Sequence, residues 1–267
     1  MKKLTQQNLP EITKYIMEEP EFNLFIIGDL ENFSLDDGNI DLYAQKSCGQ
    51  WDFLILRYFD SYMLYSRRKN YDAKAAANFL AKQDCNVISG KGEVLERLAP
   101  FLPGRRIVKS RLCCLRETAL SPAPPKNVEI RRLRPGDASE MICLYLQIEE
   151  FRDNYLGRER KAENEIRCNL QKGGRSYGAF LNGKLAAIAS TTAENSVSAM
   201  VVGVATLPQA RQLGLASCLV TNLCREVLAE DRRFLCLFYN NPTAGNIYFE
   251  IGFQDIGSYI MLKRKTD

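Results

Sequence analysis

The stretch that most constrains the fold is VVGVATLPQARQLGLASCLVTNLCREVL, residues 201–228. Its first third is rich in valine, as buried strands are, and it leads into a loop that contains Gly214 and Ala216. After the loop, apolar residues recur at the spacing of one helix face, at Leu219, Val220, Leu223 and Val227. The stretch therefore predicts a strand, a glycine-containing loop and a helix, in that order.

The loop of this unit predicts an anion-binding site. A glycine just before a helix lets backbone N–H groups point outward at the positive end of the helix dipole, and small neighbouring residues leave room for a bulky anion. A phosphate or pyrophosphate is the ligand that suits this chemistry. The loop has neither the G-K-[ST] of a P-loop nor the G-x-G-x-x-G of a dinucleotide site. An ordinary strand-to-helix turn is the alternative interpretation.

Strands and helices alternate on either side of this unit from residue 128 onward. Further strands are expected after residue 251 and at 128–133, 177–181, 185–190, 196–206 and 234–239. Helices are expected from residue 135 and over 159–171, 214–230 and 241–251. The pair Asn182-Gly183 predicts a hairpin turn, and Asn241 followed by a proline predicts a helix start.

The first part of the chain repeats nearly the same order of elements. Its expected helices are 7–17, 22–33, 72–82 and 93–102, and its expected strands lie near residue 3 and at 40–46, 52–58, 62–66, 86–89 and 107–115. The proline-rich stretch TALSPAPPKN, residues 118–127, interrupts both patterns. We therefore predict two domains of one architecture, residues 1–118 and 127–267, joined by a linker at 119–126.

The composition excludes several classes of function. There is no histidine, which removes the serine triad, the cysteine–histidine dyad and His-ligated metal sites, and the nine cysteines show no zinc spacing, so no metal is expected. The net charge of +4 is too weak to favour nucleic acid as a partner. No run approaches the roughly eighteen apolar residues of a membrane span, and the charged N-terminus does not resemble a signal peptide. We expect a cytoplasmic protein with neither a nucleic-acid nor a membrane partner.

Two motifs together resemble the GNAT superfamily of N-acetyltransferases. The acetyl-CoA loop of that family follows the pattern [RQ]-x-x-G-x-[GA] after a proline, and this chain has Pro208 followed by RQLGLA at residues 211–216. A second pattern of the family, N-x-x-A-x-x-x-Y-x-x-x-G-F, matches Asn241, Ala244, Tyr248, Gly252 and Phe253. The predicted order of elements over residues 127–267 agrees with the same family.

The resemblance implies an α/β (α+β) fold with two GNAT-like domains, each a mixed, mostly antiparallel central sheet flanked by helices. In tandem members of the family, one half holds the cofactor, while the other is degenerate and contributes walls to the acceptor site. Residues 127–267 match the first role. Residues 1–118 match the second, because the stretch RRKNYD at 67–72 enters its helix without a glycine.

The resemblance also assigns contacts to acetyl-CoA, which is a co-substrate in this family. The strand before the loop would offer the backbone of Val204 and Thr206 to the pantetheine arm, and Asn241 would hydrogen-bond near the thioester. Arg211 would touch a phosphate. The N–H groups expected to take the pyrophosphate belong to Gln212, Leu213, Gly214, Leu215, Ala216 and Ser217.

Tyr248 is the residue expected to carry chemistry. After an amine attacks the thioester, the leaving thiolate needs a proton, which a phenol with an ordinary pKa of about 10 can supply. The alternative role of Tyr248 is packing of its helix on the sheet. The strand before the loop carries no acidic residue, so the general base stays open among Glu149, Glu150 and Asp153.

The expected function is transfer of an acetyl group from acetyl-CoA to a primary amine, by direct attack in a ternary complex. The alternative is a non-catalytic acyl-CoA sensor or structural module. The acceptor is expected to be an amine on a small molecule or a peptide. The sequence fixes neither its identity nor the oligomeric state.

Overall fold

The computed structural model describes residues 1–119 and 123–265, and these form two compact units. Unit 1 comprises Met1–Cys113 together with the segment that begins at Asp255, and unit 2 comprises Cys114–Gln254. Residues 120–122 of the predicted linker lie outside the described residues. Within the described part of the chain, no helix combines the length and apolar character needed to cross a membrane.

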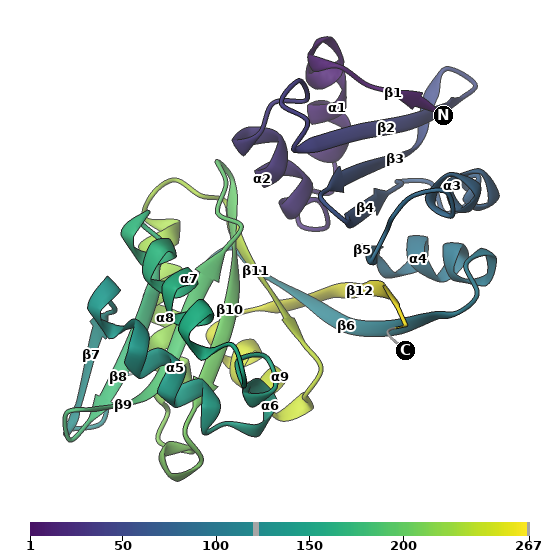
Figure 1. The fold of residues 1–267 in the computed structure, drawn as a ribbon. Helices are drawn as coiled ribbons and strands as arrows, with labels where there is room; N and C mark the ends of the chain where they lie inside the picture. The colour runs from purple at the N-terminus through teal and green to yellow at the C-terminus, as the bar shows by residue number, and fades with distance from the viewer. Residues whose placement is uncertain (120–122, 266–267) are drawn as a thin grey trace. The chain divides into compact units, whose positions relative to one another are not determined.

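The sheet of unit 1 runs in the order β1-β2-β3-β4-β5-β12 (Figure 1). Neighbouring strands are antiparallel except β4 and β5, which are parallel. The strands are β1 (Lys2–Lys3), β2 (Ile40–Ser47), β3 (Gln50–Tyr58), β4 (Ser61–Tyr65), β5 (Val87–Lys91) and β12 (Gln254–Arg264). The helices are α1 (Leu9–Ile16), α2 (Leu24–Asn32), α3 (Ala73–Leu80) and α4 (Gly92–Leu98), and β6 (Arg105–Leu115) follows them.

The core of unit 1 forms where α3 and α4 pack on the sheet. Phe53 and Ile55 of β3 are fully buried in this cluster together with alanines and leucines of the two helices. Ile260 and Leu262 of β12 belong to the same cluster. Residues Asp52–Leu56 of β3 are all buried, so both faces of this strand are covered.

The last strand corrects the expected domain boundary. Residues 127–267 were predicted to form one contiguous domain, but Tyr259–Lys263 of β12 pair with Lys91–Val87 of β5 in unit 1. The burial of Ile260 and Leu262 beside α4 stabilises this arrangement. The pattern of β12 alone does not distinguish the two sheets, because an apolar strand has the same alternation whichever core it covers.

Unit 2 repeats the order of elements of unit 1. Its sheet runs β7-β8-β9-β10-β11, antiparallel except for the parallel pair of β10 and β11. The strands are β7 (Val128–Arg132), β8 (Ser176–Leu181), β9 (Lys184–Thr192), β10 (Ser198–Thr206) and β11 (Phe234–Tyr239). The helices are α5 (Ala138–Leu146), α6 (Glu149–Arg152), α7 (Glu159–Gln171), α8 (Leu215–Leu228) and α9 (Pro242–Ile251).

Helices cover both faces of the unit 2 sheet. Five consecutive residues of β9, Leu185–Ala189, are buried, and successive side chains of a strand point to opposite faces. Both α5 and α8 contact β9. The turn before β9 has positive φ at Asn182 (51°) and Gly183 (76°), which is the backbone of the predicted hairpin. The mostly antiparallel sheet flanked by helices confirms the expected fold class.

A buried arginine joins three parts of unit 2 on the approach to β8. Arg175 pairs with Glu194 after β9 (3.2 Å), with Glu226 of α8 (3.3 Å) and with Glu230 after α8. Its side chain is 9% exposed. Replacing Arg175 with methionine is expected to lower the free energy of unfolding by about 1–3 kcal/mol, because the carboxylates lose their shared cation and keep only Arg132 or Arg232. Urea unfolding of both proteins measures this difference.

The same cluster predicts loss of stability in acid. Hydrogen bonds from Arg175 and Arg232 lower the pKa of the Glu230 carboxyl from 4.5 to about 2. A carboxyl with a depressed folded-state pKa contributes stability above its unfolded value and loses it as pH falls towards its folded value. Stability should therefore decline between pH 4.5 and 2. In Arg175→Met this part of the decline should be smaller, and an equal decline in both proteins would contradict the assignment.

Candidate functional site

A cavity of about 600 Å³ opens in unit 2 where β10 and β11 separate. The parallel pairing of the two strands ends at Val201 and Leu237, although β10 continues to Thr206. The cavity is lined by the end of β10, the loop before α8, the first turn of α8, the segment around α6, and α9. The lining residues are Ile148, Glu150, Phe151, Val204, Ala205, Thr206, Ala210, Arg211, Gln212, Gly214, Leu215, Ala216, Ser217, Asn241, Thr243, Ala244, Ile247 and Tyr248.

A bulge at Gly203 shapes the part of β10 that faces this cavity. The register with β9 shifts between Val202 and Ala205, and Gly203 has a φ of +61°. The buried hydroxyl of Tyr145 donates a hydrogen bond to the Gly203 carbonyl (3.4 Å). A Cβ atom at Gly203 would lie 2.6 Å from that hydroxyl oxygen. Both the backbone conformation and the close approach of Tyr145 therefore require glycine here.

Replacing Gly203 with alanine tests this bulge. We expect a loss of stability of about 1–3 kcal/mol, because alanine adopts positive φ poorly and its Cβ displaces the Tyr145 hydroxyl. In the background of Tyr145→Phe, which removes the hydroxyl, the cost of the alanine should be smaller. Thermal unfolding of the four proteins measures the coupling between the two positions, and strictly additive effects would contradict the contact.

The loop before α8 and the first turn of that helix line the cavity. Gln212 and Gly214 have positive φ (65° and 73°), and Gly214 is the N-cap of α8. Cys218 is the first residue whose N–H bonds back into the helix, to the Gly214 carbonyl. The N–H groups of residues 215–217 precede it, and helix geometry gives them no partner within α8. The structure thus shows a glycine N-cap followed by three N–H groups without a partner in their helix, and the binding of an anion to them stays a prediction.

The cavity brings together Tyr248 and all but one of the residues expected to contact the co-substrate. Leu213 is the exception: it does not line the cavity, and its side chain is 43% exposed. It stands between the two residues with positive φ. Asn241 lines the cavity and is also the N-cap of α9, because its side chain accepts a hydrogen bond from the Thr243 N–H (2.9 Å). Part of its hydrogen-bonding capacity is thus used within the helix.

Tyr248 lines the cavity from the middle of α9 and is 8% exposed. Its ring packs edge-on against Tyr239 of β11 (6.5 Å between centroids) and Phe253 (6.0 Å). These contacts fix the ring in place, so the packing role considered from the sequence is present. A role in proton transfer also requires that Tyr248 reaches the cavity, and Tyr248 does line it.

The sequence analysis missed several lining residues, among them Ala205 and Ala210. Ile148 is the N-cap of α6 and Phe151 lies within it, and this helix has only four residues and therefore no periodic signal. Thr243 and Ile247 come from α9, as does Ala244, which the second motif contains but to which no role was given. Ala244 lies four residues before Tyr248, so the two residues share one face of α9. This spacing can be read from the sequence. Ile247 directly precedes Tyr248. Of the three candidate bases only Glu150 lines the cavity.

Charge is sparse in the cavity. Among its lining residues only Glu150 and Arg211 carry a charge, and the two form an ion pair with 3.5 Å between carboxylate and guanidinium. The Arg211 Nε also donates to the Thr206 carbonyl (3.4 Å). Throughout residues 1–119 and 123–265, no group of three or more Cys, Asp or Glu side chains is placed to hold a metal ion.

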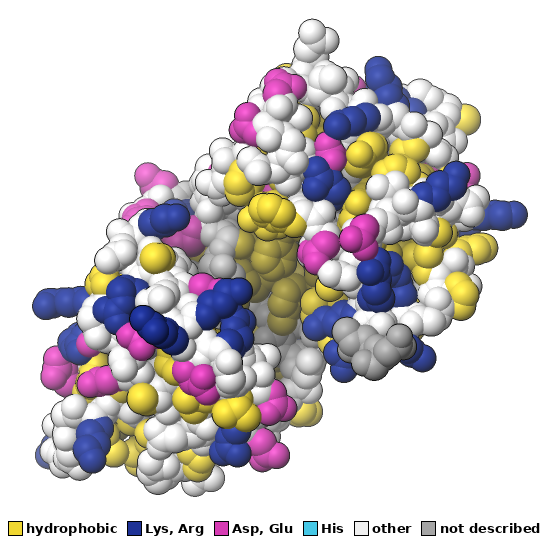
Figure 2. Space-filling model, viewed as in Figure 1, with side chains coloured by type: hydrophobic (Ala, Val, Ile, Leu, Met, Phe, Trp, Pro, Cys, Tyr) yellow, Lys and Arg dark blue, Asp and Glu magenta, His cyan; other side chains and the backbone are white. Residues whose placement is uncertain are grey.

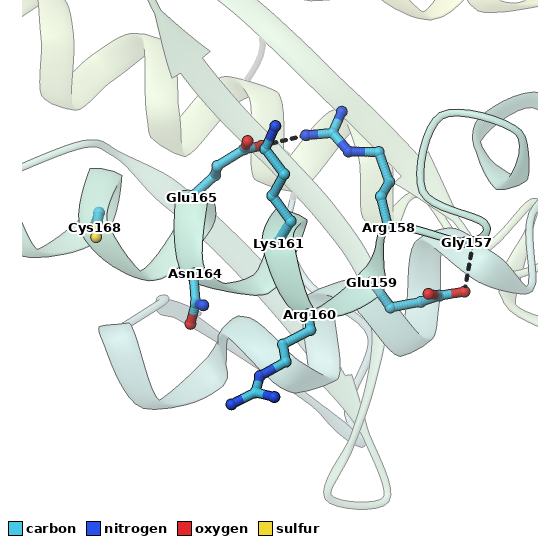
Figure 3. A pocket seen from close by; sticks show the side chains of 8 residues that line it. All are labelled: Gly157, Arg158, Glu159, Arg160, Lys161, Asn164, Glu165 and Cys168. Carbon is cyan, nitrogen blue, oxygen red and sulfur yellow. Dashed lines mark hydrogen bonds and ion pairs between the residues drawn. The ribbon is translucent and has the colours of Figure 1, made fainter.

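A second pocket, of about 700 Å³, lies at the start of α7 and is lined by charged side chains (Figure 3). Arg158 pairs with Glu165, seven residues along the chain, and the Glu159 carboxylate accepts the Gly157 N–H (2.8 Å). Arg160 and Lys161 also line the pocket. On the face drawn in Figure 2, basic and acidic side chains are interspersed.

Comparison with known proteins identifies the fold. The family model described as FR47-like protein matches residues 176–262, from β8 to β12. A solved structure of a Drosophila protein aligns over 99% of both chains with a TM-score of 0.70 at 16% identity. A GCN5-related N-acetyltransferase from Kribbella flavida covers 81% of this chain and 88% of its own, with a TM-score of 0.59 at 17% identity. The fold is that of the GNAT superfamily.

One of the solved structures with a similar fold is itself a tandem protein. A tandem GNAT protein from the clavulanic acid biosynthesis pathway covers 92% of this chain and 89% of its own, with a TM-score of 0.52 at 16% identity. The predicted resemblance to the GNAT superfamily is thus confirmed. No curated protein matches the sequence.

Proposed function

We propose that unit 2 is an N-acyltransferase that moves an acetyl group from acetyl-CoA to a primary amine on a small molecule or peptide. The observation that carries the proposal is one cavity that joins a row of helix N-terminal donors at residues 215–217 to the ring of Tyr248. Anion-binding donors at one end and a phenol at the other match the two ends of an acyl-CoA.

The cavity fits the co-substrate in size and in donor chemistry. Its volume of about 600 Å³ lies within the usual range of ligand sites. Beyond Val201, β10 has no pairing with β11, which supports a role for its backbone at Val204 and Thr206 in hydrogen-bonding an extended amide-containing chain such as pantetheine. The N–H groups at the start of α8, together with Arg211, suit a pyrophosphate.

The proposed reaction is a direct transfer. The acceptor ammonium loses one proton to solvent, and the neutral amine forms a C–N bond with the thioester carbonyl carbon. The C–S bond then breaks, the amide nitrogen loses a second proton, and Tyr248 donates a proton to the leaving sulfur. The phenolate of Tyr248 takes up the second proton. The products are the acetylated amine, CoA as its thiol and one released proton, so atoms and charge balance.

Unit 1 is proposed to be a non-catalytic copy. Its parallel pair β4 and β5 corresponds to β10 and β11, but a Cβ on Gly90 would lie 2.3 Å from the Leu64 carbonyl oxygen. The two strands therefore still lie close together at Gly90 and Leu64, one position beyond their last pair, Met63 and Ser89. Lys91 adds ion pairs to Glu19 (2.6 Å) and Glu93 (2.8 Å) at the same place. A loop like the one before α8 needs a glycine to direct its N–H groups at a pyrophosphate. The corresponding stretch of unit 1, residues 67–72, contains no glycine.

Two measurements on the purified chain test the proposal. Calorimetry is expected to show one acetyl-CoA site per chain, and incubation with acetyl-CoA and a library of primary amines is expected to release free thiol. Binding without thiol release from any amine would favour the acyl-CoA sensor. Absence of both binding and release would contradict the acyl-CoA site altogether.

A further inference from the structure

The ion pair between Glu150 and Arg211 crosses the cavity from α6 to the loop before α8. It joins the only two charged residues that line the cavity, at a separation of 3.5 Å. The two side chains remain 61% and 49% exposed. A pair that is this exposed and this long is weak, on the order of 0.2–1 kcal/mol. It is therefore easily exchanged for a stronger partner of either charge.

When an anion binds at the start of α8, Arg211 is already paired with Glu150. A pyrophosphate carries more charge than a single carboxylate and forms shorter, charge-assisted hydrogen bonds with a guanidinium, so it displaces Glu150. Competition between Glu150 and the phosphates for Arg211 weakens the binding of an anionic ligand.

We infer that Glu150 is a built-in competitor of CoA for Arg211, which lowers the affinity of the cavity for CoA and speeds its release after transfer. The inference rests on the proposed function, because it takes CoA as the ligand of the loop. In an acyltransferase, free CoA is a product, and product release limits turnover in many enzymes. A weak intramolecular pair that re-forms on Arg211 leaves the loop ready to exchange the spent thiol for a new acyl donor.

The chain offers a matched control for the charge itself. Glu149 precedes Glu150, is exposed, and does not line the cavity. Glu149→Gln and Glu150→Gln change the net charge of α6 equally, so a long-range electrostatic effect appears in both variants. Only Glu150→Gln frees Arg211.

The test measures the affinity of CoA by calorimetry and its dissociation rate by stopped flow. Glu150→Gln should bind CoA about two- to fivefold more tightly, mainly through slower dissociation, while Glu149→Gln matches the original protein. Acetyl-pantetheine, which lacks the phosphates, should bind both variants equally. In an Arg211→Gln background, the Glu150 substitution should no longer change CoA affinity.

Each contrary result has a distinct meaning. If the original protein binds no CoA, the proposed function fails and the inference fails with it. If it binds CoA but Glu150→Gln and Glu149→Gln behave alike, only the inference is overturned. An equal gain for acetyl-pantetheine, or a gain that persists without Arg211, also overturns it, because Glu150 would then act on the apolar part of the cavity.

Discussion

Replacing Tyr248 with phenylalanine is expected to lower kcat by about 10²- to 10⁴-fold, the usual contribution of a general acid. The substitution removes one oxygen and keeps the ring, so the edge-on contacts with Tyr239 and Phe253 survive. The affinity for CoA and the thermal stability should therefore change little. Single-turnover measurement of thiol release reports the chemical step without interference from product release.

Tyr239→Phe is the matched control for this experiment. The ring of Tyr239 packs against Tyr248, but Tyr239 does not line the cavity. If loss of any hydroxyl next to the site slows transfer, both variants will be slow. A Tyr248→Phe protein that turns over at the original rate would show that Tyr248 only packs α9 on the sheet, and the CoA site would stand without it.

Gly214→Val is expected to act on binding instead. The backbone at Gly214 has a φ of +73°, yet no atom lies within 4 Å of where a Cβ would be. The sequence predicts two costs for valine here, obstruction of the approach to a pyrophosphate and a penalty at any positive φ, and the structure shows the positive φ. A β-branched residue adopts this conformation at a cost of about 1–3 kcal/mol, so the loop shifts and CoA affinity should fall about tenfold or more.

Two further glycine-site variants separate binding from stability. Gly183→Val places the same residue at a φ of +76° with open space around it, in the turn between β8 and β9. It should lose comparable stability but keep its affinity for CoA. Gly214→Asn should bind CoA nearly as the original does, because asparagine tolerates positive φ. Calorimetry with CoA on Gly214→Val, Gly183→Val and Gly214→Asn measures these affinities. Equal CoA affinity of Gly214→Val and Gly183→Val would contradict a role of the loop before α8 in CoA binding.

Local patterns predicted most elements of this fold. The helix at 159–171 and the strand at 234–239 occur with the predicted bounds, because apolar spacing within a window reports which face is buried. The same holds for the loop before α8, where Gly214 and the apolar residues after it lie within one short stretch. Residues near one another in sequence suffice to determine these features.

Features that depend on distant parts of the chain escaped prediction. The pairing of β12 with β5 joins residues about 170 positions apart, and the apolar alternation of β12 suits either sheet. Of the three acidic residues Glu149, Glu150 and Asp153, only Glu150 lines the cavity, and this depends on how the four-residue helix α6 packs beside the loop. The bulge at Gly203 depends on a tyrosine 58 positions earlier.

The membership of β12 in unit 1 reverses the usual order of folding during synthesis. Domains ordinarily fold from the N-terminus as they leave the ribosome. Here every strand of the β7–β11 sheet is translated before the residues of β12, so unit 2 can fold while unit 1 still lacks a strand beside β5. The first hundred residues wait with one sheet edge and part of their core uncovered until the last ones arrive. A ribosome that stalls after residue 254 would thus leave the first-made unit as the unfinished one.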